Sequence, residues 1–137
     1  MTDFPITIFH NPACGTSRNA LAMIRASGRE PAVVNYLKTG WTRPQLLGLL
    51  AEMSATPRDL LRTRGTPAEA LGLLAPETTD DRILDAMVAN PILVNRPIVR
   101  TPKGTLLCRP SELVLRLLDA PAAEFTKEDG ERVRGSS

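Results

Sequence analysis

The sequence predicts an α/β fold built on a small mixed sheet, and two patterns carry this prediction. A short β-branched and aromatic run over residues 6–9 is followed by an amphipathic helical stretch and then by a second apolar run over residues 32–37. Later in the chain, short apolar runs over residues 97–101 and 105–108 flank Pro-Lys-Gly, which is typical of a β-hairpin.

The first pattern indicates a βαβ unit. The apolar stripe of its helix consists of Leu21 and Ile24 with the flanking Ala20 and Met23, and Gly28 ends the helix. A strand, a helix and a strand in this order favour a parallel pair with a right-handed crossover.

The segment over residues 40–91 is interpreted as a helical insertion. Capping boxes begin at Thr42 and Thr66, because each Thr is followed three residues later by Gln or Glu. Thr56 precedes a proline, which is well suited to the first helical position. A fourth helix is expected over residues 80–89, with a core-facing stripe made of Ile83, Leu84, Met87 and Val88.

The last part of the chain completes the plan. Ser111 is expected to cap a helix over residues 112–118, and residues 121–137 are expected to form a polar tail that is mobile in part. The element order matches a thioredoxin-like, glutaredoxin-like mixed sheet, with the helical insertion between an N-terminal βαβ unit and a C-terminal ββα unit. Residues 1–137 are therefore expected to form one domain.

Composition excludes several classes of protein. The 137 residues are 42% hydrophobic with a net charge of +2, which suits a globular core and gives no argument for nucleic-acid binding. No apolar run reaches the roughly 18 residues of a membrane span, and the N-terminus lacks the pattern of a secretory signal. One histidine and two distant cysteines do not make a metal site. We expect a cytoplasmic protein with reduced thiols and no membrane association.

Cys14 is the candidate nucleophile. It lies between the end of the first strand and the start of the first helix, where α/β folds bind their ligands. The backbone N–H groups of Gly15, Thr16 and Ser17, together with the helix dipole, favour a thiolate there and also form a cradle for an oxyanion.

Two familiar cysteine motifs are absent from this loop. Ser17 occupies the position that would make a Cys-x-x-Cys dithiol, and Ala20 occupies the arginine position of a Cys-x5-Arg phosphatase loop. Cys108, inside a predicted strand, is interpreted as a core residue. Any second thiol is therefore expected to come from outside the chain.

Four motifs stand out along the chain. They are His-Asn-Pro-Ala-Cys-Gly-Thr-Ser-Arg-Asn at 10–19, Leu-Leu-Arg at 60–62, Asn-Arg-Pro-Ile-Val at 95–99 and Leu-Cys-Arg-Pro-Ser-Glu at 107–112. Together they closely resemble the glutaredoxin-coupled bacterial arsenate reductases, and the resemblance extends from Ile6 to the segment at 125–131.

The resemblance implies an arsenate reductase that uses glutathione as co-substrate and glutaredoxin as partner, with no tightly bound cofactor. It implies that Cys14 is catalytic and that His10 helps to keep it ionised. It implies a cis proline at Pro97, and three arginines around the bound oxyanion, namely Arg62, Arg96 and Arg109.

Physical reasoning supports this implication in part. Guanidinium groups bind tetrahedral oxyanions through charge-assisted hydrogen bonds, and Arg96 and Arg109 lie at element ends, where sites are usually built.

Three alternatives remain open. They are a non-enzymatic relative that binds RNA polymerase, a monothiol glutaredoxin-like iron–sulfur protein, and a reductase of another oxyanion or a glutathione conjugate.

Overall fold

A computed structural model describes residues 3–134. The chain divides into two compact units, of which unit 1 comprises residues 1–35 and 96–137 and unit 2 comprises residues 36–95. The predicted helical insertion falls within unit 2, and the predicted nucleophile lies in unit 1. Each unit is described separately.

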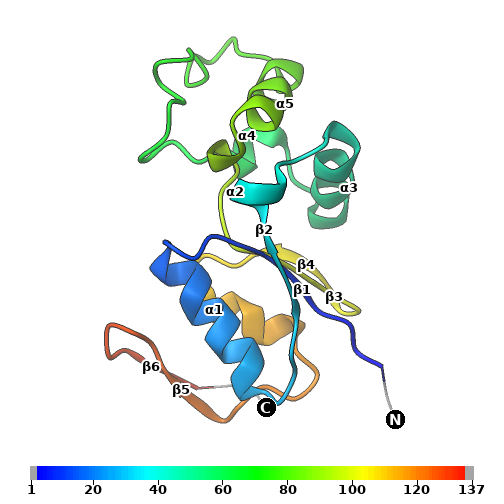
Figure 1. Cartoon of the computed structure of the whole chain (residues 1–137), viewed down its shortest axis with the longest axis vertical. Helices are drawn as coiled ribbons and strands as arrows, with labels where there is room; N and C mark the ends of the chain where they lie inside the picture. Colours follow the sequence, from blue (N-terminus) through cyan, green and yellow to red (C-terminus); the bar gives the residue numbers. More distant parts are fainter. Residues whose placement is uncertain (1–2, 135–137) are drawn as a thin grey trace. The chain divides into compact units, whose positions relative to one another are not determined.

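Unit 1 contains a four-stranded mixed sheet (Figure 1). Its strands are β1 (Thr7–His10), β2 (Ala32–Asn35), β3 (Ile98–Thr101) and β4 (Gly104–Leu107), in the order β2-β1-β3-β4. Strand β1 pairs parallel with β2 and antiparallel with β3, and β3 pairs antiparallel with β4. This topology confirms the predicted thioredoxin-like plan.

Two helices complete the core of unit 1. Helix α1 (Gly15–Ala26) packs against the 3-10 helix η2 (Ser111–Leu117), which also packs against β3 and β4. The apolar side chains predicted for α1 lie in this core, with Ala20, Met23 and Ile24 fully buried and Leu21 packed against them.

The η2 segment differs from its prediction. It is a 3-10 helix that begins after Pro110, and Ser111 makes no cap and is itself buried. Its buried residues include Ser111, Val114 and Leu117, which are spaced by three. That spacing matches the three-residue turn of a 3-10 helix and explains why this winding packs best against the sheet.

The segment predicted as a polar tail contains a second, two-stranded sheet. Strand β5 (Glu124–Thr126) pairs antiparallel with β6 (Arg132–Arg134). Val133 belongs to the core of unit 1, and Phe125 packs against that core. Residues 135–137 of the predicted tail lie outside the described residues.

Unit 2 is mainly helical. Its elements are α2 (Tyr36–Thr39), α3 (Arg43–Met53), α4 (Pro57–Leu60), α5 (Asp80–Ala89) and the 3-10 helix η1 (Pro91–Leu93). The capping box at Thr42 is confirmed, and Thr56 caps α4 in a second box with Asp59. Strand β2 ends at Asn35 because its partner β1 ends at His10, so the predicted strand residues Tyr36 and Leu37 belong to α2 instead.

Two further predictions for unit 2 are wrong. No helix begins at Thr66, whose hydroxyl instead donates to the Arg62 carbonyl, and residues 67–74 form turns. Gly72 adopts a left-handed φ of 75°, which stops the chain before a stable helix length is reached. In α5, Ile83, Leu84 and Met87 are buried as predicted, but Val88 near the helix end is 39% exposed.

Candidate active site

The loop that carries Cys14 is shaped by its own backbone. The Cys14 N–H donates to the Asn11 carbonyl at 3.0 Å, and the Asn11 side chain accepts from the Ala13 N–H at 2.9 Å. Cys14 is thereby held in an extended conformation as the N-cap residue of α1, with only 8% of its surface exposed. Asn11 was not among the predicted site residues, although its place before a proline is a recognised turn signal.

The surroundings of the Cys14 thiol favour its ionised form. Burial is the largest single influence and raises the pKa, but the Ser17 backbone N–H and the side chains of Arg96 and Arg109 outweigh it. Together they lower the pKa of Cys14 to about 7 from its ordinary value of 9.0. A substantial fraction of the thiol is therefore thiolate at neutral pH.

Arg109 connects the thiol to the loop before β3. Its Nη1 lies 3.7 Å from the Cys14 Sγ and donates to the Arg96 carbonyl at 2.9 Å. The peptide bond between Arg96 and Pro97 is cis, as the resemblance implies, and so is the one between Arg109 and Pro110. Unit 1 therefore brings two of the three predicted arginines to Cys14.

His10 contacts Ser17 in the loop that follows β1. Its Nδ1 lies 2.6 Å from the Ser17 Oγ, which also accepts from the Asn11 N–H at 3.1 Å. Burial, followed by the charges of Arg25 and Arg18, lowers the pKa of His10 below its ordinary value. The imidazole is consequently neutral at pH 7, and the Ser17 hydroxyl is occupied within the protein. The backbone N–H of Ser17, by contrast, interacts with the Cys14 thiol.

Gly15 and Thr16 occupy the first two positions of α1 and are half-buried. N–H groups in the first turn of a helix have no partner inside the helix, so these two remain suited to an oxyanion.

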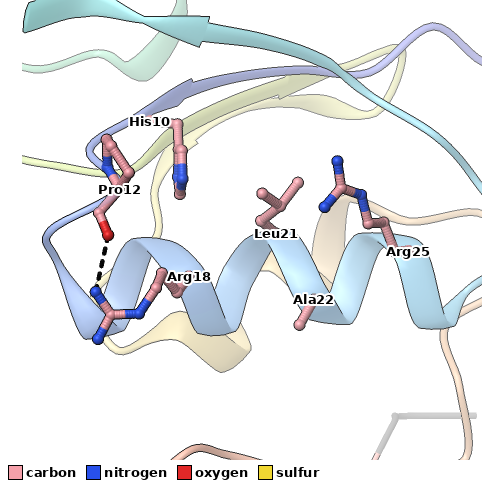
Figure 2. Close-up of a pocket in the computed structure, with 6 residues that line it drawn as sticks. All are labelled: His10, Pro12, Arg18, Leu21, Ala22 and Arg25. Atoms are coloured by element: carbon pink, nitrogen blue, oxygen red, sulfur yellow. Dashed lines mark hydrogen bonds between the residues drawn. The ribbon is translucent and has the colours of Figure 1, made fainter.

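A cavity of about 440 Å³ lies beside this loop. Figure 2 shows its lining, which consists of His10 from β1, Pro12 from the loop, and Arg18, Leu21, Ala22 and Arg25 from α1. Arg18 also donates to the Pro12 carbonyl at 2.8 Å, the contact drawn as a dashed line. Cys14 is not among the lining residues, so the cavity is separate from the thiol.

Arg62, the third predicted arginine, belongs to unit 2. Its backbone N–H donates to the Leu93 carbonyl at 2.7 Å, next to an isolated β-bridge between Leu61 and Val94. Its guanidinium donates to the Arg64 carbonyl at 3.2 Å and lies 3.5 Å from the Asn95 side-chain oxygen. These contacts hold both the backbone and the guanidinium of Arg62 within unit 2.

Cys108 is a core residue, as predicted. It is fully buried between β4 and η2, and burial raises the pKa of its thiol to about 12. A neutral, inaccessible thiol cannot readily attack a partner sulfur. Within residues 3–134, no three His, Cys, Asp or Glu side chains lie together in a way that could hold a metal ion.

Comparison with known proteins identifies the family of this chain. Residues 9–117 match the model of the ArsC family. The chain belongs to the ArsC family. Over 97% of its length it is 60% identical to an arsenate reductase of Synechocystis sp., covering 93% of that protein. It is also 58% identical over 93% of its length to the arsenate reductase of Escherichia coli, covering 92% of that protein.

Solved structures agree with this ArsC-family assignment. The arsenate reductase of Vibrio cholerae superposes with a TM-score of 0.80 at 31% identity, over 85% of this chain and all of that one. The fold of the chain is therefore the one that arsenate reductases of this family adopt. None of the helices over residues 3–134 has the length and apolar character of a membrane span.

Proposed function

We propose that this protein is an arsenate reductase whose Cys14 thiolate forms a covalent bond to arsenic, with glutathione and glutaredoxin supplying the electrons. The observation that carries the proposal is a cysteine whose pKa is lowered to about 7 beside two arginines. Membership of the ArsC family and the high identity to arsenate reductases support the reaction.

The first step is nucleophilic attack. The Cys14 thiolate forms an S–As(V) bond, and one arsenate oxygen takes up a proton and leaves as water. Arg96 and Arg109 hold the remaining oxygens through charge-assisted hydrogen bonds, and the family resemblance makes Arg62 the candidate for a third such contact. Backbone N–H groups at the start of α1 stabilise the negative charge that develops on these oxygens.

The electrons come from two external thiols. A glutathione thiol displaces a second oxygen as water and forms an As–S bond. A glutaredoxin thiolate then attacks the glutathione sulfur, which leaves a mixed disulfide and transfers two electrons to arsenic. Hydrolysis of the remaining bond between Cys14 and As(III) releases arsenite and restores the thiol. The buried Cys108 supports this external route, because its neutral thiol is a poor attacking group. The chain needs no tightly bound cofactor for these steps.

The decisive experiment measures arsenite production from arsenate by the purified protein with glutathione and glutaredoxin supplied. We expect arsenite from the wild type and none from Cys14→Ser, since a serine hydroxyl is scarcely ionised near pH 7. Cys108→Ala is the matched control, because it removes the other thiol from the core, and we expect it to keep most of the activity.

Other outcomes would identify the alternatives. Loss of activity in a folded Cys108→Ala protein would make Cys108 a resolving thiol and overturn the external route. No arsenite from a folded wild type would reject the proposed reaction and favour a different oxyanion or a non-enzymatic role.

A further inference from the structure

A hydrogen-bonded ion pair joins the C-terminal hairpin to the Cys14 loop. Arg18, on the first turn of α1, donates through Nε and Nη2 to the two carboxylate oxygens of Glu128 at 2.8 and 2.9 Å. Its third nitrogen, Nη1, donates to the Pro12 carbonyl at 2.8 Å. One guanidinium thus ties the turn between β5 and β6 to the backbone two residues before Cys14.

A second contact reinforces the first. The Glu128 backbone N–H donates to the Asn19 side-chain oxygen at 3.0 Å. A Cβ built on Gly15 would lie 3.7 Å from Glu128 Oε1, so the carboxylate stands directly beside the residue that follows the nucleophile. The hairpin turn therefore contacts both the loop and the start of α1.

The hairpin itself is firmly anchored in unit 1. Lys127, adjacent to Glu128, places its Nζ 2.8 Å from Glu112 and 2.6 Å from Glu131, and only 10% of its side chain is exposed. Val133 lies in the core. An anchored turn can hold the loop in one conformation, whereas a mobile tail could not.

We propose that Arg18 and Glu128 are positioning residues for arsenate reduction, which hold the Cys14 loop in its reactive conformation from the β5–β6 hairpin. The inference rests on the proposed function. Glu128 and the rest of the β5–β6 hairpin lie beyond residues 9–117, the segment that the family model matches.

Electrostatics alone predicts the opposite effect, which makes the proposal testable. Glu128 carries a negative charge next to the place where a thiolate and an oxyanion meet. Removing that charge should attract arsenate and stabilise the thiolate if only Coulomb forces mattered. An exposed ion pair also contributes little to folding stability, and the side chains here are 43% and 47% exposed. A loss of activity when Glu128 is removed would therefore indicate that this residue positions the Cys14 loop.

The test compares Glu128→Ala with Glu124→Ala. Glu124 is a matched control because it lies on the same hairpin and forms an exposed ion pair with Arg132 at 3.0 Å, away from the loop. We expect Glu128→Ala to lower kcat/KM for arsenate by about threefold to tenfold, in line with the net value of one ordinary hydrogen bond, because Glu128 acts on the reacting atoms only through the loop. Glu124→Ala should retain the wild-type value.

Two further measurements separate positioning from charge. The midpoint pH for alkylation of Cys14 should rise in Glu128→Ala, because a relaxed loop loses the Ser17 N–H contact. Arg18→Lys should not keep the loop in its reactive conformation, since an ammonium cannot make the forked contact with the Glu128 carboxylate. An unchanged or increased kcat/KM with an unchanged or lowered midpoint would overturn the proposal. If neither the wild type nor Glu124→Ala produced arsenite, the proposed function would have failed. The alkylation midpoint of Glu128→Ala would then still show whether Glu128 holds the Cys14 loop in place.

Discussion

At the scale of single residues, the chemistry of this protein depends on the balance of forces at one thiol. Burial opposes ionisation of Cys14, and a backbone N–H and two guanidinium groups reverse that tendency. Burial also acts on Cys108, without such partners, and raises its pKa to about 12. The two cysteines of this chain therefore differ in reactivity because Cys108 is more deeply buried and lacks the partners that stabilise the Cys14 thiolate.

Alkylation kinetics should reveal this separation. We expect the rate of reaction with iodoacetamide, which is uncharged, to rise with pH with a midpoint at about 7, the pKa of Cys14. Because this pKa is lower than that of an unfolded cysteine, ionisation stabilises the folded protein above pH 9 or so, and the contribution is lost as pH falls through about 7.

Mass spectrometry would identify the labelled residue in that experiment. We expect modification of Cys14 only, and none of Cys108 in the folded protein. A midpoint near the ordinary value for cysteine would contradict the stabilised thiolate.

Arg109→Lys tests the geometry of the guanidinium. The change keeps the positive charge but cannot contact both the Cys14 sulfur and the Arg96 carbonyl in the same way. We expect kcat/KM for arsenate to fall by about tenfold to a hundredfold, the value of one charge-assisted hydrogen bond. Arg100→Lys, the same change at a residue of strand β3, serves as the comparison. Equal kinetics in Arg109→Lys and wild type would remove Arg109 from the reaction.

At the scale of elements, capping and strand pairing decide where each helix and strand begins. Thr42 accepts from the Gln45 N–H at 3.2 Å and its own N–H donates to the Gln45 side chain at 3.4 Å, so α3 starts where the sequence predicts. Helix α3 is further tied to α5, because Arg43 pairs with Asp85 at 2.7 Å and with Asp81.

Thr42→Ala should therefore destabilise unit 2. Loss of this N-cap is expected to cost about 1 kcal/mol of unfolding free energy. Thr42→Ser, which keeps the capping oxygen, should remain close to wild type. Urea denaturation followed by circular dichroism would measure both variants, and equal midpoints for Thr42→Ala and wild type would refute the role of the cap.

At the scale of the whole molecule, the three predicted arginines are divided between the two units, with Arg96 and Arg109 in unit 1 and Arg62 in unit 2. The contacts that stabilise the Cys14 thiolate all come from unit 1, whereas Arg62 is held within unit 2. Thiolate formation and oxyanion binding are therefore expected to respond differently to mutation.

Arg62→Ala tests that separation. We expect kcat/KM for arsenate to fall at least tenfold, because one of the proposed oxyanion contacts is lost, while the alkylation midpoint of Cys14 stays at about 7. The neighbouring exposed Arg64→Ala provides a matched control. Unchanged arsenate kinetics in Arg62→Ala would exclude Arg62 from the site.

The sequence by itself determined the thioredoxin-like plan, the position of Cys14 at the start of α1, and the core location of Cys108. These features follow from short-range information, namely apolar periodicity, capping residues and turn signals within about ten residues. The arginine motifs were accessible only through the resemblance, because fourteen arginines in a chain give no local sign of which face a thiol.

Only the tertiary structure decided which long-range partners form. The pairing of Arg18 with Glu128 joins residues 110 positions apart, and no local pattern distinguishes it from two solvated charges. The same holds for the contact between the Ser17 hydroxyl and His10. It also holds for the β5–β6 hairpin, whose Val133 packs into the core of unit 1. Local propensity sets where elements begin and end, and packing between distant segments sets what their side chains contact.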